Sequence, residues 1–194
     1  MALQAGFADP VRESQRVFRA TLDALAHPGR VVHVASTATP PARLAPATVA
    51  VVLTLLDYDT PVWLDAAAAT PDAVEYVRFH CGAQLVAAPA AARFAVVVNA
   101  AAMPAFGSLD PGTDERPDRS TTLILQVAGL RAGQGRRLRG PGIEGESRLE
   151  VIGAPAALWD GLRANLATFP RGIDVVLCAG DSVAVLPRTT RVED

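Results

Sequence analysis

Residues 169–193 read FPRGIDVVLCAGDSVAVLPRTTRVE, and this stretch is the most informative about the fold. Two short apolar runs, residues 173–179 and 183–186, flank the Gly180-Asp181 pair. Apolar, β-branched runs that are joined by a turn containing glycine are typical of a buried β-hairpin. Polar side chains stand only at the ends of the runs. The stretch therefore predicts a hairpin in the core with charged groups at its rim.

The rim of this hairpin is a candidate site for an anion. Arginine presents a planar fork that matches phosphate or phosphonate oxygens, and threonine hydroxyls add further donors. A tight turn would bring both ends of the hairpin to one edge of the sheet. We assign to this site Arg171, Asp174, Arg188, Thr189 and Thr190. The alternative is a structural role, in which Arg171 pairs with Asp174 or Arg188 pairs with Glu193, and the sequence favours neither.

The composition limits the possible functions. The chain has 194 residues, of which 50% are apolar, and this length predicts one domain that spans residues 1–194. The net charge of −2 argues against a general nucleic-acid binder or a membrane-surface protein. All 18 basic residues are arginine. Without a lysine, no side-chain amine can form a Schiff base with pyridoxal phosphate, and we expect no cofactor.

The cysteines and the apolar segments predict a cytoplasmic protein that does not enter the membrane. Cys81 and Cys178 stand among apolar residues, as buried free thiols usually do. The first ten residues lack the basic and apolar regions of a signal peptide. Residues 86–106 are apolar enough to raise the question of a membrane span, but Arg93, Asn99 and two prolines interrupt them.

The first helix is predicted to begin at Asp9-Pro10, where aspartate caps the helix and proline takes its first position. Pro28-Gly29 ends it. We expect its buried stripe to consist of Phe18, Leu22 and Leu25, which have helical spacing. Another face carries Arg12, Arg16 and Arg19. These arginines are a candidate partner interface, although a row of charged residues on a helix more often forms a face that is exposed to solvent.

The rest of the chain alternates helices and strands, and later strands come in hairpins. Predicted helices cover residues 47–56, the segment from Thr70 to Gly82, and the segment from Pro155 to Pro170. Predicted strands cover residues 30–34, 62–64, 85–87, 94–98, 123–127, 136–139 (after a turn at 133–135) and 148–152, with a long irregular segment at 106–120. This order predicts an α/β fold with a mixed sheet and helices packed on it.

Three further motifs do not predict a catalytic site. Residues 140–145, GPGIEG, match a dinucleotide-binding pattern, but Pro141 lacks an N–H and a strand follows, so we interpret them as a turn. Asp57 and Asp59 are interpreted as turn residues rather than as a carboxylate pair. Arg78 and His80 end a predicted helix and are added to the candidate anion site, although a helix-end role is the simpler interpretation. No ligand spacing predicts a metal site.

Several stretches, in this order along the chain, resemble the PhnH family, the H subunit of the bacterial carbon–phosphorus lyase system. They are FRATLDALAHPG (residues 18–29), DYDTPVWL (57–64), RFH (78–80), LILQV (123–127), GPGI (140–143) and residues 169–193. The resemblance implies a three-layer α/β/α fold with a mixed sheet, like that of pyridoxal-phosphate-dependent transferases but without the cofactor. It also implies a homodimer that joins subunits G, I and J.

Two functions are compatible with these observations. The resemblance implies a subunit that supports synthesis of α-D-ribose 1-methylphosphonate 5-triphosphate from ATP and phosphonate in phosphonate catabolism, with catalysis attributed to subunit I. ATP or phosphonate are candidate ligands of this chain. The alternative is a stand-alone enzyme or binding protein that holds a nucleotide phosphate or another anion at the Arg171 and Arg188 rim.

Overall fold

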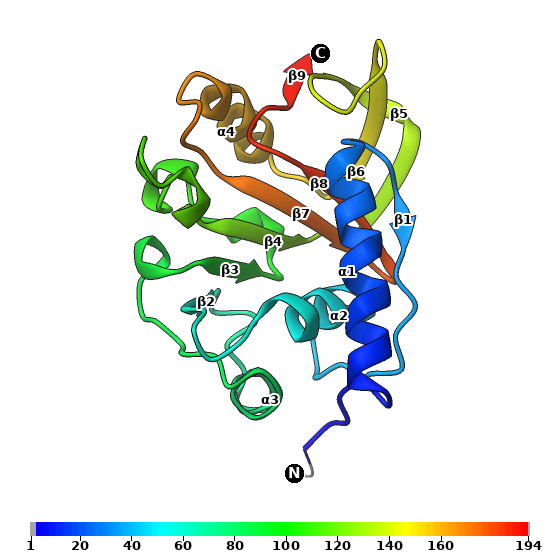
Figure 1. The fold of residues 1–194 in the computed structure, drawn as a ribbon, viewed down its shortest axis with the longest axis vertical. Helices are drawn as coiled ribbons and strands as arrows, with labels where there is room; N and C mark the ends of the chain where they lie inside the picture. The colour runs from blue at the N-terminus through cyan, green and yellow to red at the C-terminus, as the bar shows by residue number, and fades with distance from the viewer. Residues whose placement is uncertain (1–2, 194) are drawn as a thin grey trace.

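The computed structural model describes residues 3–193, which build an α/β fold around a six-stranded mixed sheet (Figure 1). Four strands are parallel, and two antiparallel strands continue the sheet at one edge. From that edge the order is β1 (Val32–His33), β8 (Ser182–Leu186), β7 (Asp174–Ala179), β4 (Thr122–Gln126), β3 (Phe94–Val97) and β2 (Val62–Leu64). The predicted mixed sheet is therefore confirmed.

The hairpin of β7 and β8 lies inside this sheet, as predicted. Val175 pairs with Leu186 at one end, and Ala179 pairs with Ser182 beside the turn. β7 also pairs with β4, and β8 with β1, so neither strand is an edge. Burial on both faces explains why the two runs are continuously apolar instead of alternating.

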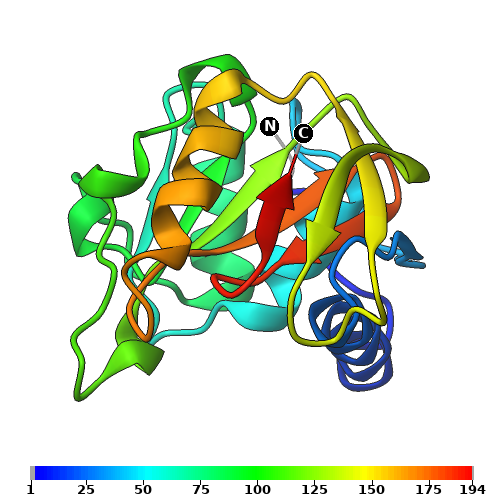
Figure 2. The same ribbon diagram turned by 90° about the horizontal axis from the view of Figure 1, so that it is seen from above.

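The two faces of the sheet are covered differently (Figure 2). On one face lie α1 (Pro10–Ala26), α2 (Pro46–Leu55) and α3 (Pro71–Cys81). On the other lie α4 (Ala156–Leu166) and a second, three-stranded sheet. Its order is β6 (Ser147–Ile152), β5 (Gly129–Arg139) and β9 (Arg191–Glu193). The third layer thus contains a small sheet as well as a helix, which the expected α/β/α arrangement did not include.

Local sequence signals set the helix ends. Asp9 accepts a hydrogen bond from the Arg12 N–H, and Thr70 caps α3 in the same way. Gly82 ends α3 in the left-handed conformation. The N-terminus of α2 has no local cap; Gln126, at the end of β4, accepts hydrogen bonds from the Ala45 N–H and the Thr48 hydroxyl there.

The prediction for the buried stripe of α1 is wrong. Phe18, Leu22 and Leu25 are exposed, and the buried positions are Glu13, Val17, Thr21 and Ala24. Both rows have helical spacing, so periodicity alone does not distinguish them. The buried side chains are smaller on average, which lets α1 lie close to α2 and the sheet. The one carboxylate among them, Glu13, accepts hydrogen bonds from Thr37.

Three other expectations change at residue level. Residues 133–135 form a bulge within the single strand β5 rather than a turn; a Cβ on Gly135 would lie 2.5 Å from Leu149 O. Residues 85–87 form only one bridge, from Leu85 to Val62. The irregular segment at 106–120 contains two short 3₁₀ turns, Phe106–Ser108 and Pro117–Arg119. Two more occur at Pro89–Ala91 and Ala100–Ala102.

The turn interpretations of two motifs are confirmed. Asp57 accepts hydrogen bonds from the Asp59 N–H and the Thr60 hydroxyl, so it stabilises its own turn. Residues 140–145 connect β5 to β6.

Among residues 3–193, no helix combines the length and the hydropathy that a membrane crossing needs.

Candidate functional site

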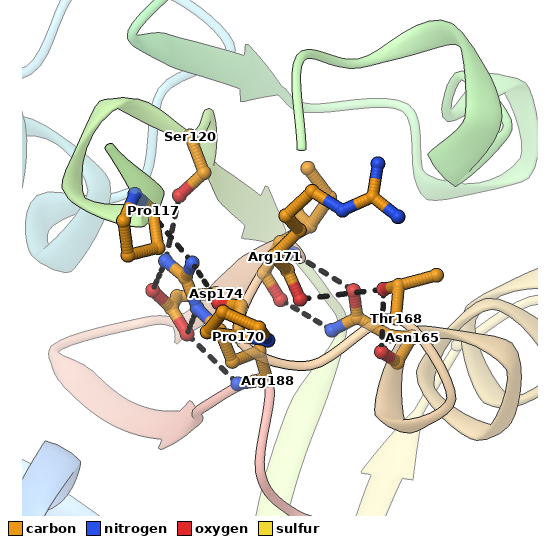
Figure 3. A network of polar contacts seen from close by, with 9 residues as sticks. Pro117, Ser120, Asn165, Thr168, Pro170, Arg171, Asp174 and Arg188 are labelled. Carbon is orange, nitrogen blue, oxygen red and sulfur yellow. Dashed lines mark hydrogen bonds and ion pairs between the residues drawn. The ribbon is translucent and has the colours of Figure 1, made fainter. Parts of the chain in front are cut away.

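The two ends of the hairpin meet at one end of the sheet, where the parallel strands β4 and β7 begin, as expected. Arg188, just after β8, binds Asp174, the first residue of β7, through its backbone N–H (2.8 Å) and its guanidinium group. We call Arg188, Asp174 and the groups they contact the rim network (Figure 3). The Arg188 and Asp174 side chains are only 14% and 24% exposed. At this burial, removal of one partner would leave the other charge partly desolvated, which costs more than the loss of a surface ion pair does.

Every N–H of the Arg188 guanidinium has an acceptor within the protein. Nε and Nη2 donate to Asp174, and Nη2 also donates to Ser120 Oγ at 2.6 Å. Nη1 donates to the carbonyl oxygens of Pro117 (2.9 Å) and Pro170 (3.2 Å). Since a guanidinium has five N–H donors, none remains for a ligand. An anion would reach Arg188 only by displacing one of these acceptors.

Arg171 points away from the rim network (Figure 3) and forms an exposed ion pair with Asp114 at 3.2 Å. Neither pairing that the sequence suggested occurs, since Arg171 does not pair with Asp174, and Glu193 pairs with Arg137. The physical reason is the strand order: β7 and β8 are neighbours, which brings Asp174 to Arg188, whereas β9 joins the other sheet.

Gly172 allows a close approach within the chain rather than to a ligand. A Cβ at this position would lie 2.5 Å from Asn165 Oδ1. That oxygen accepts the Ile173 N–H at 2.8 Å, while Asn165 Nδ2 donates to Ile173 O at 2.7 Å. The buried Asn165 thereby ties the end of α4 to the start of β7.

The other predicted anion-site residues lie apart from the rim network. Thr190 is buried, and its hydroxyl has no partner among residues 3–193. Thr189 lines a separate hollow beside Arg139 and Arg191. Thr189 and Thr190 therefore turn toward the second sheet, where β9 begins.

Arg78 and His80 lie on α3, next to β2 at the far edge of the sheet (Figure 1). His80 Nε2 lies 3.0 Å from Gln4 O, and its ring packs against Tyr76 at 4.4 Å. The Tyr76 hydroxyl donates to Ala5 O. His80 thus attaches the N-terminal segment to α3, and Arg78 is exposed nearby.

Helix α1 carries an exposed row of large apolar side chains. Val11 is 81% exposed, Phe18 46%, Leu22 44% and Leu25 39%, and we call these four residues the α1 outer row. Their spacings of seven, four and three residues place them on one stripe, the pattern of a helix that packs against another. Arg12, Arg16 and Arg19 are exposed beside the row.

An apolar groove of about 200 Å³ runs between this helix and the sheet. Its lining includes Phe18, Leu22 and Leu25 from α1, with Phe94, Val176 and Val185 from the strands. Three of the four residues of the α1 outer row therefore form the wall of a groove and are not a scatter of single exposed residues.

The inner face of α1 holds a buried carboxylate, Glu13, which is 1% exposed. Burial raises its pKa, but hydrogen bonds from the Thr37 hydroxyl (2.6 Å), the Thr37 N–H (2.9 Å) and the Asp9 N–H (3.2 Å) outweigh this effect. The net pKa lies below its usual value. Glu13 therefore remains charged and connects α1 to the loop around Thr37.

The two thiols are poor nucleophiles in this environment. Burial raises the pKa of Cys81 and of Cys178 to about 12, so both stay protonated at neutral pH. Among residues 3–193, no group of three or more His, Cys, Asp or Glu side chains is placed to hold a metal ion.

Sequence reasoning missed a polar pocket of about 560 Å³, which we call the edge pocket. It lies where β2, β3 and β4 begin, beside the rim network, and it shares Phe94 and Thr122 with the apolar groove. Its lining consists of Asp59, Thr60, Pro61, Arg93, Phe94, Asp118, Arg119, Ser120 and Thr122. The available signal was Arg93, which interrupts an otherwise apolar segment just before a strand.

Comparisons with known proteins agree over nearly the whole chain. A family model described as bacterial phosphonate metabolism protein (PhnH) matches residues 5–193. The alpha-D-ribose 1-methylphosphonate 5-triphosphate synthase subunit PhnH of Rhizobium meliloti (strain 1021) is 46% identical over 187 residues, which cover 96% of this chain and 94% of that protein. A putative C-P lyase subunit protein, HtxG of Stutzerimonas stutzeri, is 33% identical over 184 residues, with 92% and 85% covered.

Proposed function

The chain belongs to the PhnH family of bacterial phosphonate metabolism proteins, and from this premise we propose that it is an accessory subunit of the carbon–phosphorus lyase complex. In this role it supports synthesis of α-D-ribose 1-methylphosphonate 5-triphosphate from ATP and phosphonate without catalysing it. The names of both relatives support membership of a complex, since each is called a subunit. The proposed partners are subunits G, I and J.

The α1 outer row is the observation that carries this proposal. A helix that turns its larger apolar side chains outward exposes surface that a monomer would bury. The adjoining groove gives such a surface the concave shape that receives a helix of another chain. We expect the row to be covered in the assembled complex.

The charges beside the row favour a different chain over a second copy. Arg12, Arg16 and Arg19 are all exposed on α1. A two-fold dimer through this row would gather two sets of these arginines in one interface. A partner helix with apolar residues flanked by Asp or Glu complements them. The occupant is therefore an acidic amphipathic helix of a partner subunit.

The finer expectations from the sequence belong to the same proposal. We infer one domain, a cytoplasmic location, a transferase-like fold that needs no pyridoxal phosphate, and a homodimer in the absence of partner subunits. That dimer would use a surface other than the α1 outer row. If the chain binds an anion, we expect the site to lie elsewhere than at Arg171 and Arg188, because both arginines already have acidic partners.

Co-expression with subunits G, I and J tests the proposed function. The wild-type chain should co-purify with them, and the complex should release adenine from ATP in the presence of methylphosphonate. The isolated chain should release none. Failure to co-purify, or adenine release by the isolated chain, would contradict the accessory role.

A double variant tests the surface. Phe18→Ser with Leu22→Ser should abolish co-purification, because it removes the centre of the row, while the melting temperature stays within a few degrees. Phe79→Ser is the matched control, since Phe79 is 70% exposed on α3, away from the row. Arg16→Glu with Arg19→Glu should also weaken assembly.

The outcomes separate the two claims. If the wild type and the double variant co-purify equally, the subunit role stands and the surface is wrong. If the double variant instead disrupts a dimer of the isolated chain, the occupant is a second copy and not a partner subunit. Sedimentation of the isolated wild type and of the variant measures this directly.

A further inference from the structure

We propose that the edge pocket binds a phosphate-type oxyanion, either a phosphate or a phosphonate group, through Arg93, Arg119 and Ser120. This inference goes beyond the accessory role, because it gives the chain a small-molecule site of its own. It also differs from the anion site that the sequence suggested, since it uses neither Arg171 nor Arg188.

The position of Arg93 is fixed by the sheet. Its backbone N–H donates to Pro61 O at 2.7 Å, and its carbonyl oxygen accepts the Thr122 N–H at 2.8 Å. Pro61 precedes β2, Arg93 precedes β3, and Thr122 begins β4. Because these strands are parallel, their starts meet at one edge. Three segments far apart in the sequence thereby form one pocket.

Arg93 also carries an unusual donor. Its Nη1 is buried and has no hydrogen-bond partner among residues 3–193. A buried charged donor without an acceptor is costly, and each such group in a native structure calls for an explanation. Every donor of the neighbouring Arg188 has an acceptor, so the fold can satisfy a guanidinium at this edge. Arg93 also lines the edge pocket, so an oxyanion bound there would supply the missing acceptor once the guanidinium turned its shielded Nη1 toward the pocket.

Arg119 and Ser120 supply the remaining donors. Arg119 is exposed at the pocket and forms no ion pair among the described residues. Asp118, whose charge attracts Arg119, binds Arg116 through two hydrogen bonds of 3.1 Å. Ser120 Oγ accepts a hydrogen bond from Arg188 at 2.6 Å, which leaves its own hydroxyl hydrogen free to donate.

The charges of the lining fit a small anion. Two carboxylates, Asp59 and Asp118, line the pocket together with Arg93 and Arg119, and Asp118 pairs with Arg116, which lies outside the lining. The lining alone is neutral, with two arginines and two aspartates, and the neighbouring Arg116 gives this region one positive charge in excess. Two guanidinium groups and a hydroxyl are the donor set that proteins use for tetrahedral oxyanions. The volume of about 560 Å³ exceeds that of a bare phosphate and leaves room for an organic remainder beside Phe94.

Calorimetry on the isolated full-length chain tests the site. Inorganic phosphate, methylphosphonate and ATP are titrated separately, at 50 mM and at 300 mM sodium chloride. At least one should bind with a submillimolar Kd that weakens at the higher salt concentration. The three titrations identify whether a bare oxyanion suffices or an organic remainder is needed.

Three variants locate the site. Arg119→Ala and Arg93→Met should each weaken binding at least about tenfold, since each removes charge-assisted hydrogen bonds. Arg78→Ala, an exposed arginine on α3, should leave the Kd unchanged. Arg119 is exposed, so its variant keeps the test decisive even if Arg93→Met unfolds.

The proposal is overturned if no probe binds below a few millimolar, or if Arg119→Ala binds as tightly as the wild type. Because the isolated chain is used, either failure leaves the accessory role untouched. Conversely, a chain that binds phosphate but never co-purifies with subunits G, I and J would retain this site and lose the proposed function.

Discussion

The rim network and the α1 outer row differ in how their side chains are satisfied. At the rim, five guanidinium donors of Arg188 meet five acceptors of the same chain. On α1, four large apolar side chains remain exposed. The polar groups at the end of the hairpin are fully hydrogen-bonded within the chain, while the apolar stripe of the helix remains exposed to solvent.

This difference shows that polarity in the sequence does not identify the surface that interacts. Arg188 and Asp174 have the residue types of a binding site, yet their geometry is that of a structural clamp. Phe18 and Leu22 have the residue types of a core, yet they are available to a partner. What remains unsatisfied in the folded chain is the better guide to function.

The largest expected effect is the loss of the clamp. Arg188→Met should lower the free energy of unfolding by about 3 kcal/mol, because it leaves Asp174 partly buried without its cation. Urea unfolding followed by circular dichroism measures this. Arg171→Met is the control, since its exposed pair with Asp114 should contribute less than about 1 kcal/mol. Equal effects of the two substitutions would mean that the Arg188–Asp174 pair stabilises the fold no more than the exposed Arg171–Asp114 pair does.

A smaller effect is expected from the glycine beside the rim network. Gly172→Ala should cost about 2 kcal/mol, because the new Cβ strains a backbone with φ of 144° and displaces Asn165 Oδ1. Gly107→Ala is the control, since a Cβ there meets nothing within 4 Å. If both variants have the same melting temperature, the close packing around Asn165 does not stabilise the fold.

The smallest effect concerns the inner face of α1. Glu13→Gln should lower stability by about 1–2 kcal/mol at pH 7, because the carboxylate accepts three hydrogen bonds. The folded pKa of Glu13 is lowered, so its contribution is present above about pH 4.5 and is lost as the pH falls through the folded value.

The wild type should therefore approach the Glu13→Gln variant in stability below pH 4.5. Unfolding curves at pH 7, 5, 4 and 3 measure the convergence. Glu75→Gln, on an exposed position of α3, should match the wild type throughout. A constant gap between wild type and Glu13→Gln at every pH would show that ionisation of Glu13 does not stabilise α1.

Local signals in the sequence predicted much of the fold. The caps at Asp9 and Thr70, the stop at Gly82 and the turn at Gly180-Asp181 all appear where expected, because each depends on neighbours within a few residues. The hairpin followed from the length and β-branched composition of the apolar runs, and the mixed sheet followed from the order of helices and strands along the chain. The bulge at residues 133–135 was missed, since a glycine pair is equally compatible with a turn.

The candidate site was less predictable. Arg188 and Asp174 were identified, but the carboxylate with which each arginine pairs depends on which strands are neighbours. The edge pocket was missed because its three segments begin near residues 59, 93 and 118 and meet only through the parallel pairing of β2, β3 and β4.

The amino-acid sequence was sufficient to predict the family, the buried hairpin and the helix ends, and its lack of lysine leaves no side-chain amine for a Schiff base. The tertiary structure alone decided which face of α1 is buried, which charges are satisfied and where Arg93 lies. The physical reason is that helical periodicity relates residues to one another without orienting the helix. Its orientation was decided by the close packing of Val17, Thr21 and Ala24 and by the partners of Glu13 at Thr37.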